Sequence, residues 1–443
     1  MHKLPTIELT EFLHFLFDFL EIKKIQYAVA RNYEELDCGN PGRDIDILLE
    51  EKNINPVISF ISRLGITITG FVQREYVTSI FCAGICWNNH LSLGLDLVHK
   101  LNYKGAPYLD LLDVLKRKRL YPGIGLTFWI PDAIDEDLIL LMEGLIVCGS
   151  IRDVYWQRII RRMDSAITAV KRLESSLGTT KAKKLLDLIH KKNLKDVMTE
   201  RSSLVYTLIS RAFIKHPFYT SKQTIVHIAR ELSIRLFKRH LFTIAFLGPD
   251  GAGKSTLISQ IALKLNGIAG KINIRHLKPV YIFKKRTTSR GVVTEPHAKP
   301  LRGWAMSNLK IILWWFELWF DRITKFPKTM TLDIFDRCMW DILIDPKRYR
   351  FNGSRTLLSG LLKLSPKIDI IAVVVSSPDT IQLRKAEVPL FETARQVSGY
   401  NNLAKDNNFL LLKNDGQIDA VAQPGIHRIT KAMSQRISHF FQV

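Results

Sequence analysis

The feature that most constrains this chain is a glycine-rich segment placed directly after an apolar run. Residues 248–256 read GPDGAGKST, which satisfies the pattern G-x-x-x-x-G-K-[ST], and residues 241–247 read LFTIAFL. Apolar residues at helical spacing follow over residues 256–265. This order of strand, turn and helix predicts a P-loop, in which backbone N–H groups and the positive end of a helix surround phosphate oxygens.

The residues of this loop have separate expected roles. Gly248, Gly251 and Gly253 allow the tight turn, Lys254 supplies a positive charge at the β- and γ-phosphates, and Ser255 offers a hydroxyl to Mg²⁺. The predicted nucleotide-binding residues are Gly248, Asp250, Gly251, Ala252, Gly253, Lys254, Ser255 and Thr256.

The length and composition indicate a multidomain globular protein. With 443 residues the chain is too long for one ordinary core, and 47% hydrophobic with 24% charged residues is typical of soluble proteins. The most apolar stretches, residues 138–148 and 311–320, are too short to span a bilayer, and we expect no transmembrane segment or signal peptide. Five cysteines without a C-x-x-C pair favour a reducing, cytoplasmic location and argue against structural zinc.

The net charge of +22 is unevenly distributed along the chain. Residues 1–150 carry 14 Lys and Arg against 20 Asp and Glu, whereas residues 151–240 carry 20 against 7 and residues 241–443 carry 30 against 15. Such basicity predicts an anionic partner: nucleotide phosphates, a phosphorylated substrate, nucleic acid or an anionic membrane surface contacted peripherally. Basic clusters at Arg158 to Arg162 and Lys181 to Lys192 are more typical of solvated helix faces, so nucleic acid is not favoured.

Three carboxylates stand out in the N-terminal third. Asp44 and Asp46 alternate with apolar residues over 44–49, so both are expected on one face of a strand. Asp96 lies in a second apolar alternation, residues 93–98. If the two strands are neighbours, the three side chains converge as a site for divalent cations that activate a nucleoside triphosphate.

This D-x-D strand with a later aspartate resembles the polymerase-beta-like nucleotidyltransferase superfamily over roughly residues 20–150. The resemblance implies an α+β domain and a metal role for Asp44, Asp46 and Asp96. A glycine pair normally precedes the acids in that superfamily, but here residues 31–35 read RNYEE. Three alternatives follow: the domain binds another ligand, Arg31 and Asn32 hold the phosphates, or the aspartates lie on the surface of an edge strand.

Two further regions follow the nucleotidyltransferase-like domain of residues 1–131. Residues 132–236 show repeated helical spacing, with a linker expected around Pro217. In residues 237–443, continuous apolar runs at 331–335, 368–375 and 409–412 accompany the run before the P-loop. Continuous apolar runs are typical of buried parallel strands, so we expect a doubly wound α/β domain with ligands at the carboxyl ends of its strands.

Charged residues sit at those strand ends. Asp336 and Arg337 directly follow the run 331–335, Asp250 lies within the P-loop, and Arg384 with Arg395 follows the next run in a segment suited to a lid. An acid beside phosphates is costly unless it holds an acceptor hydroxyl, which is the expected role of Asp250.

Together these motifs resemble thymidylate kinase and the wider nucleoside monophosphate kinase group. The resemblance covers residues 241–443 and rests on G-x-D-G-A-G-K-[ST], on the D-R pair, and on an arginine-bearing segment followed by Tyr400 and Leu403. It implies ATP and Mg²⁺ as cofactors, with Lys254, Asp336, Arg337 and Arg384 as catalytic residues, Ser255 and Asp336 at the metal, and Asp250 at the acceptor.

The chain departs from that group where the acceptor is recognised. Residues 294–300 read TEPHAKP in place of an arginine-glutamate-proline motif, which makes His297 and Lys299 candidates for acceptor recognition. A tryptophan-rich helix over 304–320 follows, which either forms core or lines a pocket for an amphipathic acceptor. This variant is similar to thymidylate-kinase-like proteins associated with bacterial surface polysaccharide clusters.

The leading functional hypothesis is an ATP-dependent kinase for a small acceptor, either a nucleoside monophosphate such as dTMP or a sugar-type molecule. The alternatives are a P-loop ATPase that acts as a regulatory switch and a nucleotidyltransferase that acts through the N-terminal acids. A homodimer is a further expected partner.

Overall fold

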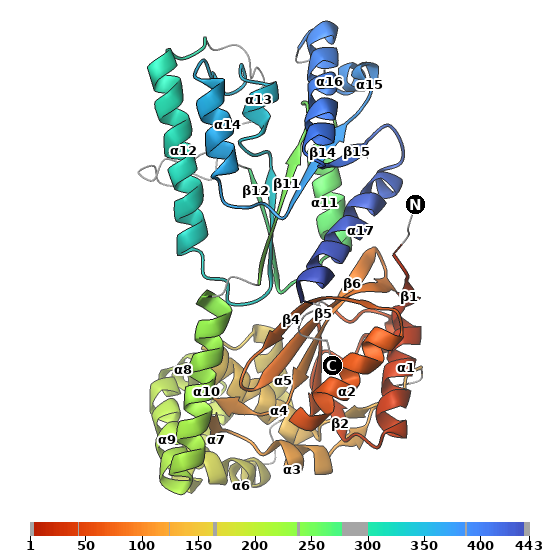
Figure 1. Ribbon diagram of the computed structural model, residues 1–443. Coiled ribbons are helices and arrows are strands. Elements are labelled where there is room, and N and C mark those ends of the chain that lie inside the picture. Colours follow the sequence, from red (N-terminus) through yellow and green to blue (C-terminus); the bar gives the residue numbers. More distant parts are fainter. Residues whose placement is uncertain are drawn as a thin grey trace. The chain divides into compact units, whose positions relative to one another are not determined.

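The computed structural model describes residues 4–42, 44–123, 125–162, 166–236, 240–276, 300–385 and 388–437. The chain divides into two compact units, an N-terminal unit, Pro5–Leu236, and a C-terminal unit, which contains Phe237–Val443. Both mix helices and strands (Figure 1).

A parallel sheet of five strands forms the centre of the C-terminal unit. Neighbouring strands in it are β12 (Lys271–His276), β13 (Thr331–Asp336), β11 (Leu241–Leu247), β14 (Ile370–Val375) and β15 (Leu410–Lys413). The predicted parallel sheet is therefore confirmed. The strand β12 was missed because its sequence KINIRH alternates polar and apolar residues, as suits an edge strand, and lacks the continuous apolar run of its neighbours.

Helices cover both faces of this sheet. Val373 of β14 shares an apolar cluster with Leu403 of α16. On the adjacent strand Leu412 pairs with Val374 and so points to the other face, where Gly425 of α17 lies against it and α11 packs beside α17. The helices of this unit are α11 (Lys254–Lys264), α12 (Trp304–Thr324), α13 (Asp341–Ile344), α14 (Arg355–Lys363), α15 (Pro378–Arg384), α16 (Leu390–Asp406) and α17 (Ile418–Ile437).

The N-terminal unit contains a mixed sheet of six strands. Its longest strands, β5 and β6, form an antiparallel hairpin whose connection contains Asn88 at φ 47°, a conformation that asparagine tolerates. Strand β3 lies between β6, to which it is parallel, and β2, to which it is antiparallel. The strands are β1 (Ile7–Glu8), β2 (Tyr27–Val29), β3 (Asp44–Leu49), β4 (Thr67–Gln73), β5 (Val77–Trp87) and β6 (His90–Val98).

Helices complete the N-terminal unit, together with two short strand pairs. The linker expected around Pro217 is wrong, because α9 ends at Lys215 and α10 begins at Pro217, a position where the missing proline N–H costs the helix nothing. The helices are α1 (Leu9–Ile22), α2 (Ile54–Arg63), α3 (Leu111–Lys116), α4 (Ala133–Met142), α5 (Asp153–Arg162), α6 (Ala166–Leu177), α7 (Thr179–His190), α8 (Leu194–Thr199), α9 (Arg201–Lys215) and α10 (Pro217–Leu236), with a π-helical turn at Glu143–Cys148. The short strands are β7 (Asn102–Tyr103), β8 (Ala106–Pro107), β9 (Arg119–Leu120) and β10 (Trp129–Ile130).

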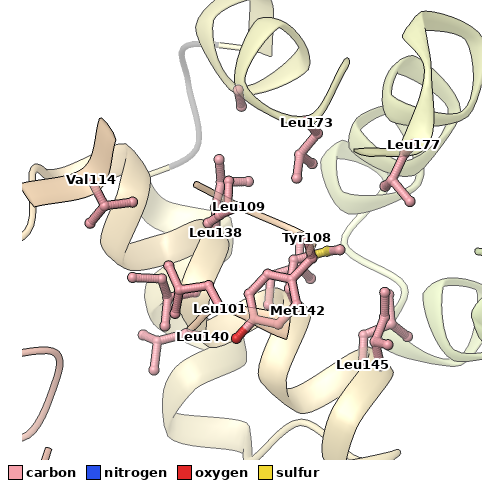
Figure 2. Packing of buried hydrophobic residues seen from close by; sticks show 14 of the residues in the cluster. Leu101, Tyr108, Leu109, Val114, Leu138, Leu140, Met142, Leu145, Leu173 and Leu177 are labelled. Carbon is pink, nitrogen blue, oxygen red and sulfur yellow. The ribbon is translucent and has the colours of Figure 1, made fainter. Parts of the chain in front are cut away.

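The helical region from residue 132 shares its core with the preceding residues. Figure 2 shows Leu101 and Tyr108, which precede α3, packed among Leu138 and Met142 of α4 and Leu173 of α6. Each such side chain contributes about 1.5–3 kcal/mol when fully buried, so the cluster binds the helices to the mixed sheet as one folded unit.

No helix among the described residues is long and apolar enough to cross a membrane. All five cysteines are free thiols, with Cys82 and Cys338 buried.

Candidate functional site

The predicted P-loop connects Leu247, the last residue of β11, to Lys254, the first residue of α11. Gly248, Gly251 and Gly253 have φ angles of 146°, 81° and 79°, a region that disfavours residues with a Cβ. A Cβ at Gly248 would lie 2.0 Å from the carbonyl oxygen of Val374. The loop therefore needs glycine at Gly248 for space as well as for backbone conformation.

Lys254 is buried and reaches back over its own loop. Its Nζ donates hydrogen bonds to the carbonyl oxygens of Gly248 at 3.0 Å and Pro249 at 2.7 Å. Burial, and then the nearby charge of Arg337, lower the pKa of Lys254 to about 7. An anion bound in the loop would restore the charged form, so Lys254 is poised to gain a proton together with a phosphate ligand.

Ser255 and Asp336 meet at the predicted metal position. The Ser255 hydroxyl donates to Oδ2 of Asp336 at 3.3 Å, and Asp336 ends β13 beside Phe246 of β11. A hydroxyl and a carboxylate fit Mg²⁺, which takes oxygen ligands and is commonly bound by one or two protein groups together with substrate phosphates. Thr256 follows on the exposed side of α11.

Arg337 is held by two carboxylates. Its Nη2 donates to Asp250 Oδ1 at 2.6 Å and its Nη1 donates to Asp341. Asp341 is fully buried and also accepts hydrogen bonds from the hydroxyls of Tyr400 at 2.7 Å and Tyr349 at 3.0 Å. Although burial acts to lower it, the pKa of Arg337 is raised by Asp341, so the guanidinium stays charged beside the loop.

Arg348 forms a second ion pair with Asp250. The expected repulsion between Asp250 and phosphates is therefore offset in this structure by two guanidinium groups. Sequence reasoning missed the partnership of Asp341 and Arg348 with the site. Arg337 has a φ of 78° and lies before α13, which begins at Asp341, so the four-residue separation of the pair is not helical spacing.

Arg384 lies beside the P-loop at the end of α15. It donates to the Ser376 hydroxyl at 3.3 Å and to the Asn414 carbonyl at 3.2 Å. Asn414 in turn donates from Nδ2 to the Ala252 carbonyl at 2.8 Å. Asn414 was also missed, although it directly follows β15 and so stands at the carboxyl end of a parallel strand.

Arg395, the other arginine of the expected lid segment, is held by a carboxylate and a backbone carbonyl. The Arg395 guanidinium is bound to Glu392 at 2.7 and 2.8 Å and to the Ile344 carbonyl at 2.9 Å. His297 and Lys299 lie outside the described residues, as does the end of the lid segment at residues 386–387. The tryptophan-rich helix α12 is not uniformly core, since Trp314 is buried while Trp304 is 63% exposed.

The N-terminal acids occupy neighbouring strands, as the sequence predicted. Asp46 of β3 pairs in register with Asp96 of β6, and Asp44 pairs with Gly94. Because β3 is an interior strand and Asp46 is buried, the alternative of surface aspartates on an edge strand is wrong. Burial, and then the charge of Asp46, raise the pKa of Asp96 to about 7.

Arg31 holds Asp46 by two hydrogen bonds. Its Nε donates at 2.7 Å and its Nη2 at 3.0 Å, while its Nη1 donates to Glu143. Asn32, the other residue considered for phosphate binding, accepts from the Tyr155 hydroxyl at 2.9 Å. Glu143 was missed because it lies far along the sequence, in the π-helical turn after α4.

The described part of the chain holds no group of three or more His, Cys, Asp or Glu side chains arranged to bind a metal ion. Arg31 neutralises the Asp46 carboxylate in this structure. The binding of a divalent cation by Asp44, Asp46 and Asp96 therefore stays a prediction.

In the first basic cluster of the helical region Arg161 is exposed, as expected, but Arg158 and Arg162 are paired with acids. Arg158 pairs with Glu34 and with the fully buried Glu136, and Arg162 pairs with Glu136 at 3.2 Å. These arginines neutralise acids of α4, which the sequence pattern could not reveal because the partners are more than 20 residues away.

No protein-family model and no curated protein sequence matches the chain. Among solved structures the chain is similar to a thymidylate kinase from Ehrlichia chaffeensis, with 17% identity and a TM-score of 0.30 over 43% of this chain and 98% of that one. A thymidylate kinase from Candida albicans matches with 16% identity and a TM-score of 0.32 over 44% of this chain and 92% of that one. A putative nucleotidyltransferase from Thermotoga maritima matches with 19% identity and a TM-score of 0.19 over 27% of this chain and 75% of that one.

Proposed function

We propose that the C-terminal unit transfers the γ-phosphoryl group of MgATP to a small acceptor, either a nucleoside monophosphate such as dTMP or a sugar-type molecule. The observation that carries this proposal is the convergence of Lys254, the Ser255–Asp336 pair and Arg337 at the carboxyl ends of β11 and β13. Phosphoryl transfer requires positioning and charge stabilisation, and these residue types supply both.

Each group has a distinct role in the proposed reaction. Lys254 and the loop N–H groups bind the β- and γ-phosphates, and Ser255 with Asp336 holds the Mg²⁺, which supplies charge neutralisation when bound. Arg337 and Arg384 stabilise the charge on the transferred group, since both guanidinium groups lie beside the P-loop.

The acceptor side of the proposal rests on Asp250. Its carboxylate lies in the loop between the guanidinium groups of Arg337 and Arg348. A carboxylate there accepts a hydrogen bond from an acceptor hydroxyl, while the two arginines offset its negative charge beside the phosphates.

An acceptor screen tests the proposal. The full chain is incubated with MgATP and separate pools of nucleoside monophosphates, sugars and sugar phosphates, and products are identified by mass spectrometry. We expect one pool to gain a phosphoryl group, and Lys254→Ala to lose at least a hundredfold in turnover. Lys405→Ala, an exposed lysine of α16, is the matched control and should keep wild-type turnover.

The screen also separates the alternatives. Release of inorganic phosphate without any phosphorylated acceptor would favour the P-loop ATPase or switch. Undiminished product formation by Lys254→Ala would remove the P-loop from the mechanism and contradict the proposal.

A further inference from the structure

Helix α10 of the N-terminal unit has the reverse polarity of an ordinary surface helix. Its polar side faces its own unit, where the Thr224 hydroxyl donates to the Lys104 carbonyl at 3.0 Å and Arg230 donates to the Arg74 carbonyl at 2.6 Å. A surface helix normally packs its apolar side on the core and presents its polar side to water. The apolar side of α10 is instead turned to solvent.

This apolar side is exposed along the length of the helix. Phe218 is 90% exposed, and Ile225, Ile228 and Leu232 are 66%, 51% and 50% exposed. Their separations of seven, three and four residues place the four side chains on one helix face, which we call the outer stripe. Soluble proteins rarely expose a continuous apolar patch unless it contacts a partner or a membrane, so the outer stripe indicates an interaction surface.

The turn between α9 and α10 adds to the exposed apolar surface beside Phe218. All of residues 213–219 are exposed, and Ile214, at the end of α9, is 81% exposed. Beneath the turn, the hydroxyl of the buried Thr220 donates to the Ala212 carbonyl at 3.0 Å and so ties the two helices together. The exposed apolar side chains therefore project from a turn that is held in place.

The charge of the two helices is almost entirely positive. Residues 201–230 contain five Lys and Arg residues and no Asp or Glu. Lys222 and Arg235 are exposed and flank the outer stripe, although Arg235 also lies 3.7 Å from Glu231. Exposed apolar side chains with basic residues beside them fit the interface of a bilayer that contains anionic lipids.

We propose that α10 docks the chain on a bilayer containing anionic phospholipids. The helix lies parallel to the bilayer surface over its length of about 30 Å, and the outer stripe enters the boundary between headgroups and acyl chains. Lys222 and Arg235 contact the headgroup phosphates from the two sides of the stripe. The hydrogen bonds of Thr224 and Arg230 keep the helix attached to its own unit during docking.

The composition of the outer stripe favours lipid over other anionic partners. Three of its four members, Ile225, Ile228 and Leu232, are aliphatic. Nucleic acid is held by basic groups at its phosphates and by aromatic rings that stack on its bases, and aliphatic side chains supply neither contact. Anionic lipid supplies both the charge that the basic residues need and the apolar environment that the stripe needs.

Vesicle flotation of the full chain tests the docking. We expect binding to phosphatidylcholine–phosphatidylglycerol vesicles that weakens as salt is raised, and about tenfold weaker binding to phosphatidylcholine alone. Phe218→Ser with Ile225→Ser removes two apolar side chains without a change of charge and should weaken binding about tenfold. Ile167→Ser, at an 86% exposed isoleucine of α6, is the matched control and should bind as the wild type does.

Lys222→Gln separates the electrostatic part of the binding. It should weaken binding to the anionic vesicles about fivefold and leave binding to phosphatidylcholine unchanged, because one basic residue near the surface contributes about 1 kcal/mol. A wild-type protein that binds neither vesicle would overturn the proposal. Binding that Lys222→Gln weakens but Phe218→Ser with Ile225→Ser does not, with all variants folded by circular dichroism, would also overturn it, because the stripe would then not enter the bilayer.

Two further outcomes would assign the outer stripe to another partner and so contradict the proposal. The first is vesicle binding that Phe218→Ser with Ile225→Ser leaves intact while light scattering shows a lower mass, which would indicate a contact between proteins. The second is tighter binding to a short DNA duplex than to the anionic vesicles.

A fluorophore tests whether the stripe enters the bilayer. Nitrobenzoxadiazole is attached to the thiol of Phe218→Cys in a background with the exposed Cys38 and Cys148 replaced by serine. Its emission should rise and shift to the blue when anionic vesicles are added, and the same label on Ile167→Cys should not respond. An unchanged emission at Phe218→Cys on vesicle-bound protein would contradict the proposed orientation of α10.

Discussion

The carboxylate of Asp341 should be the most sensitive single group of the C-terminal unit. It is fully buried, pairs with the buried guanidinium of Arg337, and accepts hydrogen bonds from two tyrosine hydroxyls. Removing one partner of a buried ion pair costs about 3–5 kcal/mol, because the other charge is left uncompensated. Each hydroxyl left without an acceptor adds about 1–3 kcal/mol.

These losses are large beside the total stability of a domain, which is about 5–15 kcal/mol. Asp341→Ala should therefore leave the unit barely folded. Asp341→Asn keeps the shape and one acceptor oxygen but not the charge, and should cost about half as much. Replacing both partners by apolar residues, Asp341→Leu with Arg337→Met, should restore the part of the stability lost to the uncompensated charge of Arg337, but not the part lost at the two tyrosine hydroxyls. Turnover should not return, because Arg337 is then absent from the site.

Urea unfolding followed by tryptophan fluorescence gives the midpoints, and hydrogen exchange with mass spectrometry locates the loss at α13 and α16. Asp406→Asn, at an exposed acid of α16, is the control and should unfold with the wild type. An Asp341→Ala protein with a wild-type midpoint would refute the reasoning, and so would a double variant no more stable than Asp341→Ala.

Four further perturbations have defined outcomes. Because the pKa of Lys254 is lowered to about 7 in the free protein, the protein should take up a proton when it binds nucleotide at pH 8. Calorimetry in buffers of different ionisation enthalpy measures this uptake. Proton uptake that persists in Lys254→Met would contradict its assignment to Lys254. The pKa of Asp96 is raised to about 7 in the folded protein, so the protonated carboxyl favours folding. This contribution to stability is complete below about pH 4 and is lost as the pH rises to 7. Asp96→Asn should flatten the pH dependence of the unfolding temperature in thermal melts. An unchanged slope would contradict the assignment of this pH dependence to Asp96. Gly248→Ala should abolish nucleotide binding in a folded protein, since its Cβ would meet the Val374 carbonyl, and normal affinity would show that the loop adapts. Arg31→Ala should lower the unfolding temperature of the N-terminal unit by several degrees, because buried Asp46 loses its partner, whereas the exposed Arg63→Ala should not.

The parallel sheet and the P-loop could be predicted because their signals are local. A buried strand such as β11 is a continuous apolar run, and the loop after it needs glycine at fixed positions. The edge strand β12 escaped prediction because half-exposed strands carry a weaker pattern.

The partners of the candidate site residues could be predicted only in part. Asp336 and Arg337 are found by their place at a strand end, and Asn414 could have been found in the same way. The ion pair of Arg348 with Asp250 and the hydrogen bond from Tyr349 to Asp341 are contacts that no sequence spacing reveals. The same holds for Glu143, whose ion pair with Arg31 joins residues more than 100 positions apart.

The most direct test of phosphoryl transfer uses ATP labelled with ¹⁸O in its γ-phosphoryl group, supplied with Mg²⁺ and the acceptor pool. The account predicts that the label appears on the acceptor, and that Asp336→Asn reduces this transfer by at least a hundredfold while the protein stays folded. Label found only in inorganic phosphate, or transfer that is unaffected by Asp336→Asn, would contradict it.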